Sequence, residues 1–427
     1  MVIRITQPIQ GGTVRAIASK SEAHRLLICA ALADCETFII CRERSEDIDA
    51  TARCLEALGA VIKYERGGFY VTPIELQKIN EKIKHHTLDC GESGATLRFL
   101  LPVCGALGLT ADFYMSGRLP ARPLSPLYEE MVSHGCVLSG QGHSPLTCGG
   151  RLTNGEYNLP GNISSQYVSG LLFALPLLSG DSIIRVSGVL ESRPYVDMTL
   201  DTMRRFGIKI LEEEPNTFTV YGGQSCRSPK TARVEGDWSN AAFWLSAGAI
   251  AKIPVVCTGL DPESKQGDKL IVNLLSRFGA NIACEKDFVR VFPGELAGID
   301  IDAGDTPDLA PVLASVAAVA EGTTVIRNAR RLRIKESDRL RAVTAVLRDL
   351  GADISETADG LIIRGKAKLT GGKTQSFGDH RLAMTAAVLS SACTGAVTIR
   401  GAEAVKKSYP DFFDDFSAAL GGIWEEV

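Results

Sequence analysis

The sequence predicts an α/β (α+β) protein of two similar domains, because one pattern of helices and strands recurs six times along the chain. Glycine ends a helix-like segment at intervals of 70 to 76 residues, at Gly59, Gly135, Gly207, Gly279, Gly351 and Gly421. Similarity at a fixed period indicates one structural unit copied along the chain. Each copy reads as strand, helix, strand, helix and two strands, so we expect three pseudosymmetric repeats in each domain.

The pattern around each of these glycines supports the helices and strands of one repeat. Amphipathic stretches with a helical period come before the glycines, as in 49–58, 198–206, 269–278 and 338–350. Pairs of segments rich in strand-forming residues follow them, as in 61–71, 208–220, 280–291 and 352–363. Each amphipathic stretch is itself preceded by a helix of small apolar residues and a strand, for example 309–320 and 323–327.

The seam between the two expected domains falls within 230–236, after the third repeat. We expect residues 17–233 to form the first domain, and residues 1–16 with 234–427 to form the second. The first residues alternate apolar with polar side chains and read as a strand, which the last repeat needs because it stops soon after Trp424. The chain would then cross twice between the domains, so we expect a hinge and an interdomain cleft that closes on a small ligand.

Composition indicates an enzyme-sized cytoplasmic protein. A chain of 427 residues with 45% hydrophobic and 22% charged residues can bury large cores, and no apolar run is long enough to cross a bilayer. The twelve cysteines include no CxxC pair, which argues against structural zinc and a disulfide framework. A net charge of -4 argues against a nucleic-acid or membrane partner. We expect a monomer.

Polar and charged residues gather where the first helix of each repeat begins. These starts read SKSEAHR, GESGATLR, NISSQYVSG, GDWSNAAF, DTPDLAPV and GDHRLAM. Serine, aspartate and asparagine commonly do no more there than cap the helix. Capping does not account for Lys20, Arg25, Arg98 and Arg381, because cations are disfavoured at the positive end of a helix dipole. Cations placed where backbone amides already attract anions predict an anion-binding site.

Nine short motifs occur in one order along the chain. They are SKSEAHR, GESGATLR, ARPLSPL, NISSQY, SRPY, TPDLAP, RIKESDRL, GDHRLAM and KKSYPDFF. Together they resemble the 5-enolpyruvylshikimate-3-phosphate (EPSP) synthase family. The resemblance implies transfer of the enolpyruvyl group of phosphoenolpyruvate to the 5-hydroxyl of shikimate 3-phosphate, with release of phosphate, in the shikimate pathway of aromatic amino acid biosynthesis. It also implies that the reaction needs no metal and no cofactor.

The same resemblance implies the residues that contact each substrate. Those for phosphoenolpyruvate are Lys20, Gly94, Arg122, Gln166, Arg339, Arg381 and Lys407. Those for shikimate 3-phosphate are Ser21, Arg25, Ser164, Ser165, Gln166, Ser192, Tyr195, Asp308, Arg331 and Lys335. As catalytic residues it implies Asp308 at the attacking hydroxyl and Glu336, beside Lys20, for proton exchange at the methylene carbon. We further expect His380 at the site and competition between glyphosate and phosphoenolpyruvate near Gly94.

Read without the resemblance, several of these residues have simpler explanations. Asp308 could cap a helix, the serine pair Ser164 and Ser165 could begin one, and Glu336 could pair with Arg339 on an exposed helix face. Three positions also depart from common family patterns: Glu92, Ala95 and Arg331. Glu92 adds negative charge near anionic substrates, so it either turns away or pairs with an arginine. Arg331 either strengthens phosphate binding or belongs to a basic surface with Arg330 and Arg333.

Two other classes of protein share features with this sequence. The UDP-N-acetylglucosamine enolpyruvyl transferase of cell-wall synthesis shares the fold, but it carries a reactive cysteine at the position of Gly117. A ring-shaped DNA clamp is also built from repeated strand and helix units. A clamp needs cations spread along a channel, whereas these cations cluster at repeat starts near Asp308 and Glu336.

Overall fold

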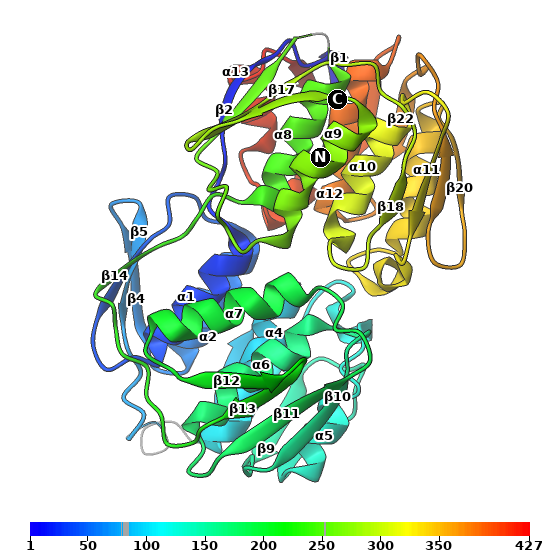
Figure 1. Ribbon diagram of the computed structural model, residues 1–427. Helices are drawn as coiled ribbons and strands as arrows, with labels where there is room; N and C mark the ends of the chain where they lie inside the picture. Colours follow the sequence, from blue (N-terminus) through cyan, green and yellow to red (C-terminus); the bar gives the residue numbers. More distant parts are fainter. Residues whose placement is uncertain (78, 80–84, 252) are drawn as a thin grey trace. The chain divides into compact units, whose positions relative to one another are not determined.

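A computed structural model describes residues 1–77, 79, 85–251 and 253–427, and the chain forms two compact units. Lys20–Val234 makes up one, which we refer to as the inner unit (Figure 1). Met1–Ser19 and Glu235–Val427 make up the other, the terminal unit. The expected domain boundaries, after residues 16 and 233, lie three residues and one residue from these.

The inner unit contains three repeats. The first consists of α1 (Lys20–Ala31), β3 (Thr37–Ile40), α2 (Glu46–Ala57), β4 (Val61–Glu65) and β5 (Gly68–Thr72), joined by β14 (Thr231–Arg233). The second consists of β6 (His86–Asp89), α4 (Gly94–Leu107), β7 (Ala111–Tyr114), α5 (Leu127–Ser133), β8 (Cys136–Leu138) and β9 (Leu146–Gly150). The third consists of β10 (Glu156–Pro160), α6 (Ser165–Ala174), β11 (Ser182–Ser187), α7 (Arg193–Arg205), β12 (Ile210–Glu214) and β13 (Thr217–Val220).

The terminal unit contains the other three repeats. The fourth consists of β2 (Gly12–Arg15), α8 (Trp238–Ile250), β15 (Val255–Thr258), α9 (Ile271–Phe278), β16 (Asn281–Cys284) and β17 (Phe288–Phe292). The fifth consists of β18 (Asp300–Asp302), α10 (Ala310–Ala317), β19 (Thr323–Arg327), α11 (Arg339–Asp349), β20 (Asp353–Glu356) and β21 (Leu361–Arg364). The sixth consists of β22 (Gly372–Gln375), α12 (His380–Leu389), β23 (Val397–Arg400), α13 (Phe412–Ala418) and β24 (Ile423–Glu426), joined by β1 (Val2–Gln7).

Each repeat builds one four-stranded sheet, and all six sheets found in the described ranges have the same topology. In the third repeat, for example, β10 runs parallel to β11, β11 pairs antiparallel with β13, and β12 lies outside β13. The parallel pair is joined across a helix, as a parallel connection requires. The predicted fold class of two similar α/β domains is therefore confirmed.

Three sheets take a strand from a distant part of the sequence. In the sixth repeat, β1 occupies the third position and pairs antiparallel with both β23 and β24. In the first repeat, β14 lies at the edge and runs parallel to β3, and in the fourth repeat, β2 lies at the edge and runs parallel to β15. These pairings supply the strands that the first, fourth and sixth repeats lack in their own stretch of sequence.

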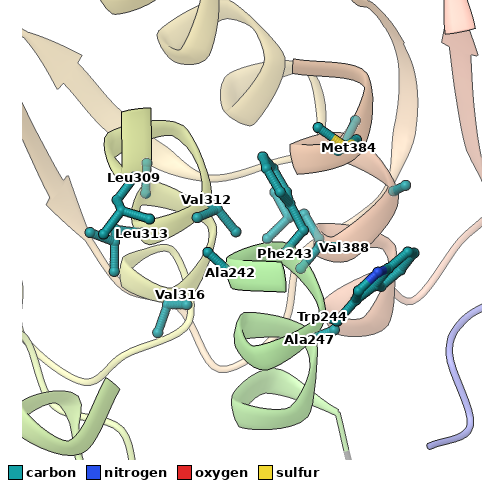
Figure 2. Close-up of a cluster of buried hydrophobic side chains, with 14 of the residues drawn as sticks. Ala242, Phe243, Trp244, Ala247, Leu309, Val312, Leu313, Val316, Met384 and Val388 are labelled. Atoms are coloured by element: carbon teal, nitrogen blue, oxygen red, sulfur yellow. The ribbon is translucent and has the colours of Figure 1, made fainter. Parts of the chain in front are cut away.

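The two helices of a repeat differ in burial. The first helices, such as α4 and α8, are buried on almost every side, which suits their small apolar residues. Figure 2 shows the core where α8, α10 and α12 meet, with Phe243, Val312, Leu313 and Val388 among the packed side chains. The second helices, such as α7 and α11, are amphipathic and cover the core.

The periodic glycines have a shared structural cause. Gly59, Gly135, Gly207, Gly279, Gly351 and Gly421 all adopt a left-handed backbone with φ between +72° and +108°. Glycine takes this conformation without the steric penalty that a Cβ imposes, so it commonly ends a helix. Within the ranges described above, no helix has the length and apolar character needed to cross a membrane.

Candidate active site

Side-chain capping accounts for part of the polar helix starts. The N-cap residues Ser93, Ser164, Asp237 and Asp379 accept backbone N–H groups of α4, α6, α8 and α12, respectively. The expectation of capping therefore holds for these four residues. It leaves the cations and carboxylates that surround them to be explained.

In the inner unit, α1 carries two cations with different surroundings. Lys20 Nζ lies 2.8 Å from a carboxylate oxygen of Asp47, which belongs to the first turn of α2. Arg25 is buried and donates to neutral groups: to Thr199 Oγ1 at 2.8 Å and to the carbonyls of Ser21 and Tyr195 at 2.6 and 2.8 Å. Burial lowers the pKa of Arg25 to about 10, so it stays charged at neutral pH. Arg25 thus joins α1 to the start of α7.

Gly94 lies against two guanidinium groups. A Cβ at this position would lie 2.5 Å from Arg98 Nη1 and 3.0 Å from Arg122 Nη1. Arg98 donates to Gln166 Oε1 at 3.1 Å and to the Pro123 carbonyl at 3.0 Å. It therefore ties α4 to the start of α6 and to the residue after Arg122. The absence of a side chain at Gly94 lets both arginines approach the backbone.

The remaining proposed residues of the inner unit lie at the starts of α6 and α7. Ser164 caps α6 by accepting the Gln166 backbone N–H at 3.3 Å, and the next residue, Ser165, is buried. Ser192, the N-cap of α7, has a left-handed backbone with φ of +56°. A positive φ is uncommon for serine and is often found at functional sites. The predicted Tyr195 lies one turn further along α7.

Arg339 is the centre of the charged cluster in the terminal unit. Its Nε donates to Asp379 at 2.7 Å, its Nη1 to Asp308 at 2.7 Å, and its Nη2 to Glu336 at 2.7 Å. The Arg339 side chain is only 2% exposed and Asp379 is fully buried. The Glu336–Arg339 pair considered from the sequence does form, but it is not on an exposed helix face. Glu336 lies before α11, and one guanidinium binds three carboxylates.

Three cations keep Asp308 ionised. Arg339 Nη1, Arg381 Nη2 and Lys335 Nζ lie 2.7, 3.5 and 3.6 Å from its carboxylate oxygens. Burial alone would raise the pKa of Asp308, but the charges of Arg381, Lys335 and Arg339 outweigh it and hold this pKa well below its ordinary value. Lys335 responds in the opposite way, because its own burial lowers its pKa to about 8 despite the attraction of Asp308.

Arg381 and Lys407 complete this cluster. Arg381 donates from Nη1 to the Asp308 carbonyl at 3.1 Å and from Nη2 to Ser239 Oγ at 2.7 Å. Lys407 is buried, with Nζ 4.0 Å from a Glu336 oxygen. The structure thus brings together Asp308, Lys335, Glu336, Arg339, Arg381 and Lys407 within the terminal unit, whereas Lys20, Gly94, Arg122 and Gln166 belong to the inner unit.

The three departures from family patterns have defined places. The Glu92 carboxylate occupies the space beside Gly117, where a Cβ would meet its Oε1 at 1.3 Å. Arg331 Nη2 donates to the Gly304 carbonyl at 2.6 Å, which anchors the loop before Asp308. Ala95 lies in the first turn of α4 and is partly exposed.

The histidines do not form metal sites in the described ranges, where no group of three or more His, Cys, Asp or Glu side chains could hold a metal ion. His380 is buried at the start of α12, next to Asp379. His24 is buried in α1, and burial lowers its pKa to about 3, so it is neutral.

Sequence reasoning missed several supporting residues. Asp47 lies just before the predicted amphipathic stretch 49–58, and it forms an ion pair with Lys20. Asp379 looked like a capping residue, and it both caps α12 and binds Arg339. Asp268 is buried, and its pKa is raised to about 6. The larger cause is burial, and the second is repulsion from Asp308. The sequence does point to Asp268, because KQGDK, which contains it, occupies in the fourth repeat the place that KESDR occupies in the fifth.

Comparisons with known proteins agree on one family. The sequence model described as EPSP synthase (3-phosphoshikimate 1-carboxyvinyltransferase) matches residues 3–416. The 3-phosphoshikimate 1-carboxyvinyltransferase of Clostridium kluyveri is 44% identical over 416 residues, which cover 97% of this chain and 96% of that protein. The protein of the same name from Clostridium acetobutylicum is 45% identical over 422 residues, with the same two coverages.

A solved structure supports the fold independently. The EPSP synthase from Acinetobacter baumannii superimposes with a TM-score of 0.81 over 100% of both chains, at 24% sequence identity. At that identity the likeness concerns the fold alone, whereas the clostridial relatives and the family match concern the activity. The chain therefore belongs to the EPSP synthase family and transfers the enolpyruvyl group of phosphoenolpyruvate to shikimate 3-phosphate.

Proposed function

We propose that the two charged regions have different tasks in this reaction. Residues for phosphoenolpyruvate are Lys20, Gly94, Arg122, Gln166, Arg339, Arg381 and Lys407. Residues for shikimate 3-phosphate are Ser21, Arg25, Ser164, Ser165, Gln166, Ser192, Tyr195, Asp308, Arg331 and Lys335. The observation that carries the proposal is the Arg339 guanidinium, which holds Asp308 and Glu336 through neighbouring nitrogens. Two carboxylates fixed by one rigid fork can serve two proton transfers.

Asp308 is the proposed acceptor for the hydroxyl proton of shikimate 3-phosphate. It is ionised over the whole physiological range because three cations surround it. As the hydroxyl oxygen attacks C2 of phosphoenolpyruvate, Asp308 orients the hydroxyl and takes its proton. The cations that surround Asp308 also favour bound phosphate and carboxylate groups.

Glu336 is the proposed residue for proton exchange at carbon, with Lys20 as a second catalytic residue. In the addition step, Glu336 delivers a proton to the methylene carbon, which becomes a methyl group. In the elimination step, a proton returns from that methyl group to Glu336, the double bond forms again, and phosphate leaves. Arg339 donates to the Glu336 carboxyl at 2.7 Å and the Lys407 ammonium lies 4.0 Å from it, so both cations hold this carboxyl in place during both steps.

The two alternative functions fit the structure less well. A cysteine at position 117 would clash with Glu92, because its Cβ would lie 1.3 Å from Oε1, and Gly117 has a left-handed φ of +55°. The reactive cysteine of the cell-wall transferase therefore has no room here. A DNA clamp has no use for Asp308, Glu336 and Asp379 buried around one arginine.

The test measures phosphate release from phosphoenolpyruvate with shikimate 3-phosphate or UDP-N-acetylglucosamine as the acceptor. We expect release only with the first. In Asp308→Asn, turnover should fall at least about a hundredfold, since general base catalysis contributes roughly 10² to 10⁴. The matched control is Asp353→Asn, which removes an exposed carboxylate 3.8 Å from Arg364 and should leave turnover unchanged. Turnover of Asp308→Asn within about threefold of the unmodified enzyme would contradict the assigned role.

We also propose that the enzyme is a cytoplasmic monomer. Every proposed substrate contact comes from a single chain, so the reaction requires no partner subunit. Sedimentation equilibrium should give the mass of one chain, 45.7 kDa, with and without substrates.

A further inference from the structure

A buried chain of hydrogen bonds links three helices of the inner unit. His24 Nδ1 in α1 lies 2.6 Å from Thr51 Oγ1 in α2, which lies 2.6 Å from Thr96 Oγ1 in α4. Thr96 Oγ1 in turn donates to Ser93 Oγ, the N-cap of α4, at 2.8 Å. All four side chains are at most 1% exposed. None of these contacts is part of the proposed substrate sets.

The direction of these hydrogen bonds fixes which ring nitrogen of His24 carries the proton. A threonine hydroxyl has one proton to give, and Thr96 gives its proton to Ser93. Thr51 must therefore donate to Thr96, and His24 Nδ1–H must donate to Thr51. The other ring nitrogen, Nε2, then carries no proton, and it has no hydrogen-bond partner among the described residues.

The charges around His24 agree with a neutral ring. Burial is the largest influence and lowers the pKa of His24 to about 3. Asp47 acts against this shift, whereas Lys20 and Arg25 add to it. Asp47 and Thr51 lie one turn apart in α2, so the same face of α2 holds Lys20 through an ion pair and His24 through a hydroxyl.

The His24 chain completes a circuit of polar contacts between helices. Arg25 joins α1 to Thr199 in α7, and Thr199 donates to Ser169 in α6 at 2.8 Å. Arg98 in α4 donates to Gln166 in α6. Among the described residues, hydrogen bonds link α4 to α1 through Thr51 and His24, and the Arg25 guanidinium also lies over the Phe99 ring of α4, 5.1 Å from its centroid. Without Thr51 and His24, the start of α4, with Gly94, would lose this hydrogen-bonded connection to the helix that carries Lys20.

We propose that His24 is a positioning residue for enolpyruvyl transfer: as the neutral tautomer protonated at Nδ1, it fixes the start of α4 relative to α1 through Thr51, Thr96 and Ser93. Its task is to hold Gly94 and Lys20 in register for phosphoenolpyruvate. This effect on phosphoenolpyruvate binding rests on the proposed function, whereas the tautomer of His24 does not.

The first experiment is nitrogen NMR on the full-length enzyme labelled at histidine. The resonances of His24 are those that disappear in His24→Asn. We expect Nδ1 protonated, Nε2 unprotonated and no titration between about pH 5 and 8, although an unperturbed histidine titrates near 6.5. A ring protonated at Nε2, or one that titrates in this range, would overturn the proposal.

The second experiment compares two substitutions at Thr51. Thr51→Val keeps the shape but removes the hydroxyl, whereas Thr51→Ser keeps the hydroxyl. We expect the valine variant to raise KM for phosphoenolpyruvate about tenfold with kcat within about threefold, and the serine variant to restore both. Thr202→Val is the matched control, because the buried Thr202 hydroxyl donates to the Met198 carbonyl of its own helix rather than to another helix of the described residues.

The outcomes separate this inference from the site assignment. An unchanged KM in Thr51→Val would overturn the positioning role even if the tautomer is as expected. If Lys20→Met also leaves KM for phosphoenolpyruvate unchanged, the binding set is wrong, and the NMR result still decides the hydrogen-bond chain. If Thr51→Val does not fold, the NMR of the unmodified enzyme still decides the tautomer on which the proposal depends.

Discussion

Two buried arginines of the inner unit and Arg339 of the terminal unit are held in different ways. Arg25 and Arg98 donate to hydroxyl, amide and carbonyl oxygens. Arg339 instead meets the three carboxylates Asp308, Glu336 and Asp379. A cation held by neutral groups attracts anionic substrates, whereas carboxylates fixed by one guanidinium are suited to proton transfer. In the proposed assignment, the two carboxylates for proton transfer, Asp308 and Glu336, lie in the terminal unit, whereas the anion-binding residues come from both units.

Breaking the carboxylate cluster should have the largest effect. Lysine at position 339 offers one compact charge in place of a rigid fork, so Arg339→Lys leaves at least one buried carboxylate without its partner. We expect the free energy of unfolding to fall by about 3 to 5 kcal/mol, measured by urea denaturation, and activity to be lost.

The control for this variant is Arg333→Lys. Arg333 also contacts two carboxylates, Asp338 and Glu356, but its side chain is 29% exposed. Exposed ion pairs contribute about 0 to 1 kcal/mol, so its loss of stability should stay within that range. Equal losses in the two variants would mean that the buried cluster has no special role.

Disturbing the two arginines beside Gly94 should affect inhibitor binding rather than stability. Glyphosate should compete with phosphoenolpyruvate, and Gly94→Ala would push its new methyl group against Arg98 and Arg122. We expect the inhibition constant for glyphosate to rise at least about tenfold, and by more than KM for phosphoenolpyruvate, in steady-state assays. If both constants rise by the same factor, Gly94 does not discriminate between the two anions.

The smallest expected effect concerns pH. Lys335 has a pKa of about 8 in the folded protein, below its ordinary value, because burial disfavours its charged form. It therefore loses its charge as pH rises through 8, and KM for shikimate 3-phosphate should increase above that pH and stay constant below it. Lys335→Arg keeps its charge at all these values and should abolish the increase. A pH profile of KM that is the same in both proteins would exclude Lys335 as a phosphate contact.

The fold could be predicted because its signals are local and repeated. Gly59 and its five counterparts mark helix ends by a backbone conformation that glycine favours, and the copies recur at nearly constant spacing. The same periodicity located the polar helix starts, at which most of the proposed site residues lie.

The cluster around Arg339 could not be predicted from its local sequence. Its carboxylates come from positions 308, 336 and 379, which only the packing of the fifth and sixth repeats brings together. Asp379 also accepts a backbone N–H of α12, so a pattern search sees only a cap. Whether an ion pair is buried or exposed depends on the packing of the whole fold, so the local sequence does not show it.

The most direct test of proton transfer by the carboxylates of the terminal unit is hydrogen exchange at carbon in Glu336→Gln. In deuterium oxide with both substrates, the unmodified enzyme should place deuterium in the methylene group, because that carbon is protonated and deprotonated in each turnover. We expect Glu336→Gln to bind both substrates by calorimetry but to exchange and release phosphate at least about a hundredfold more slowly. Exchange at the unmodified rate in this variant would contradict the assignment of proton transfer to the terminal unit's carboxylates.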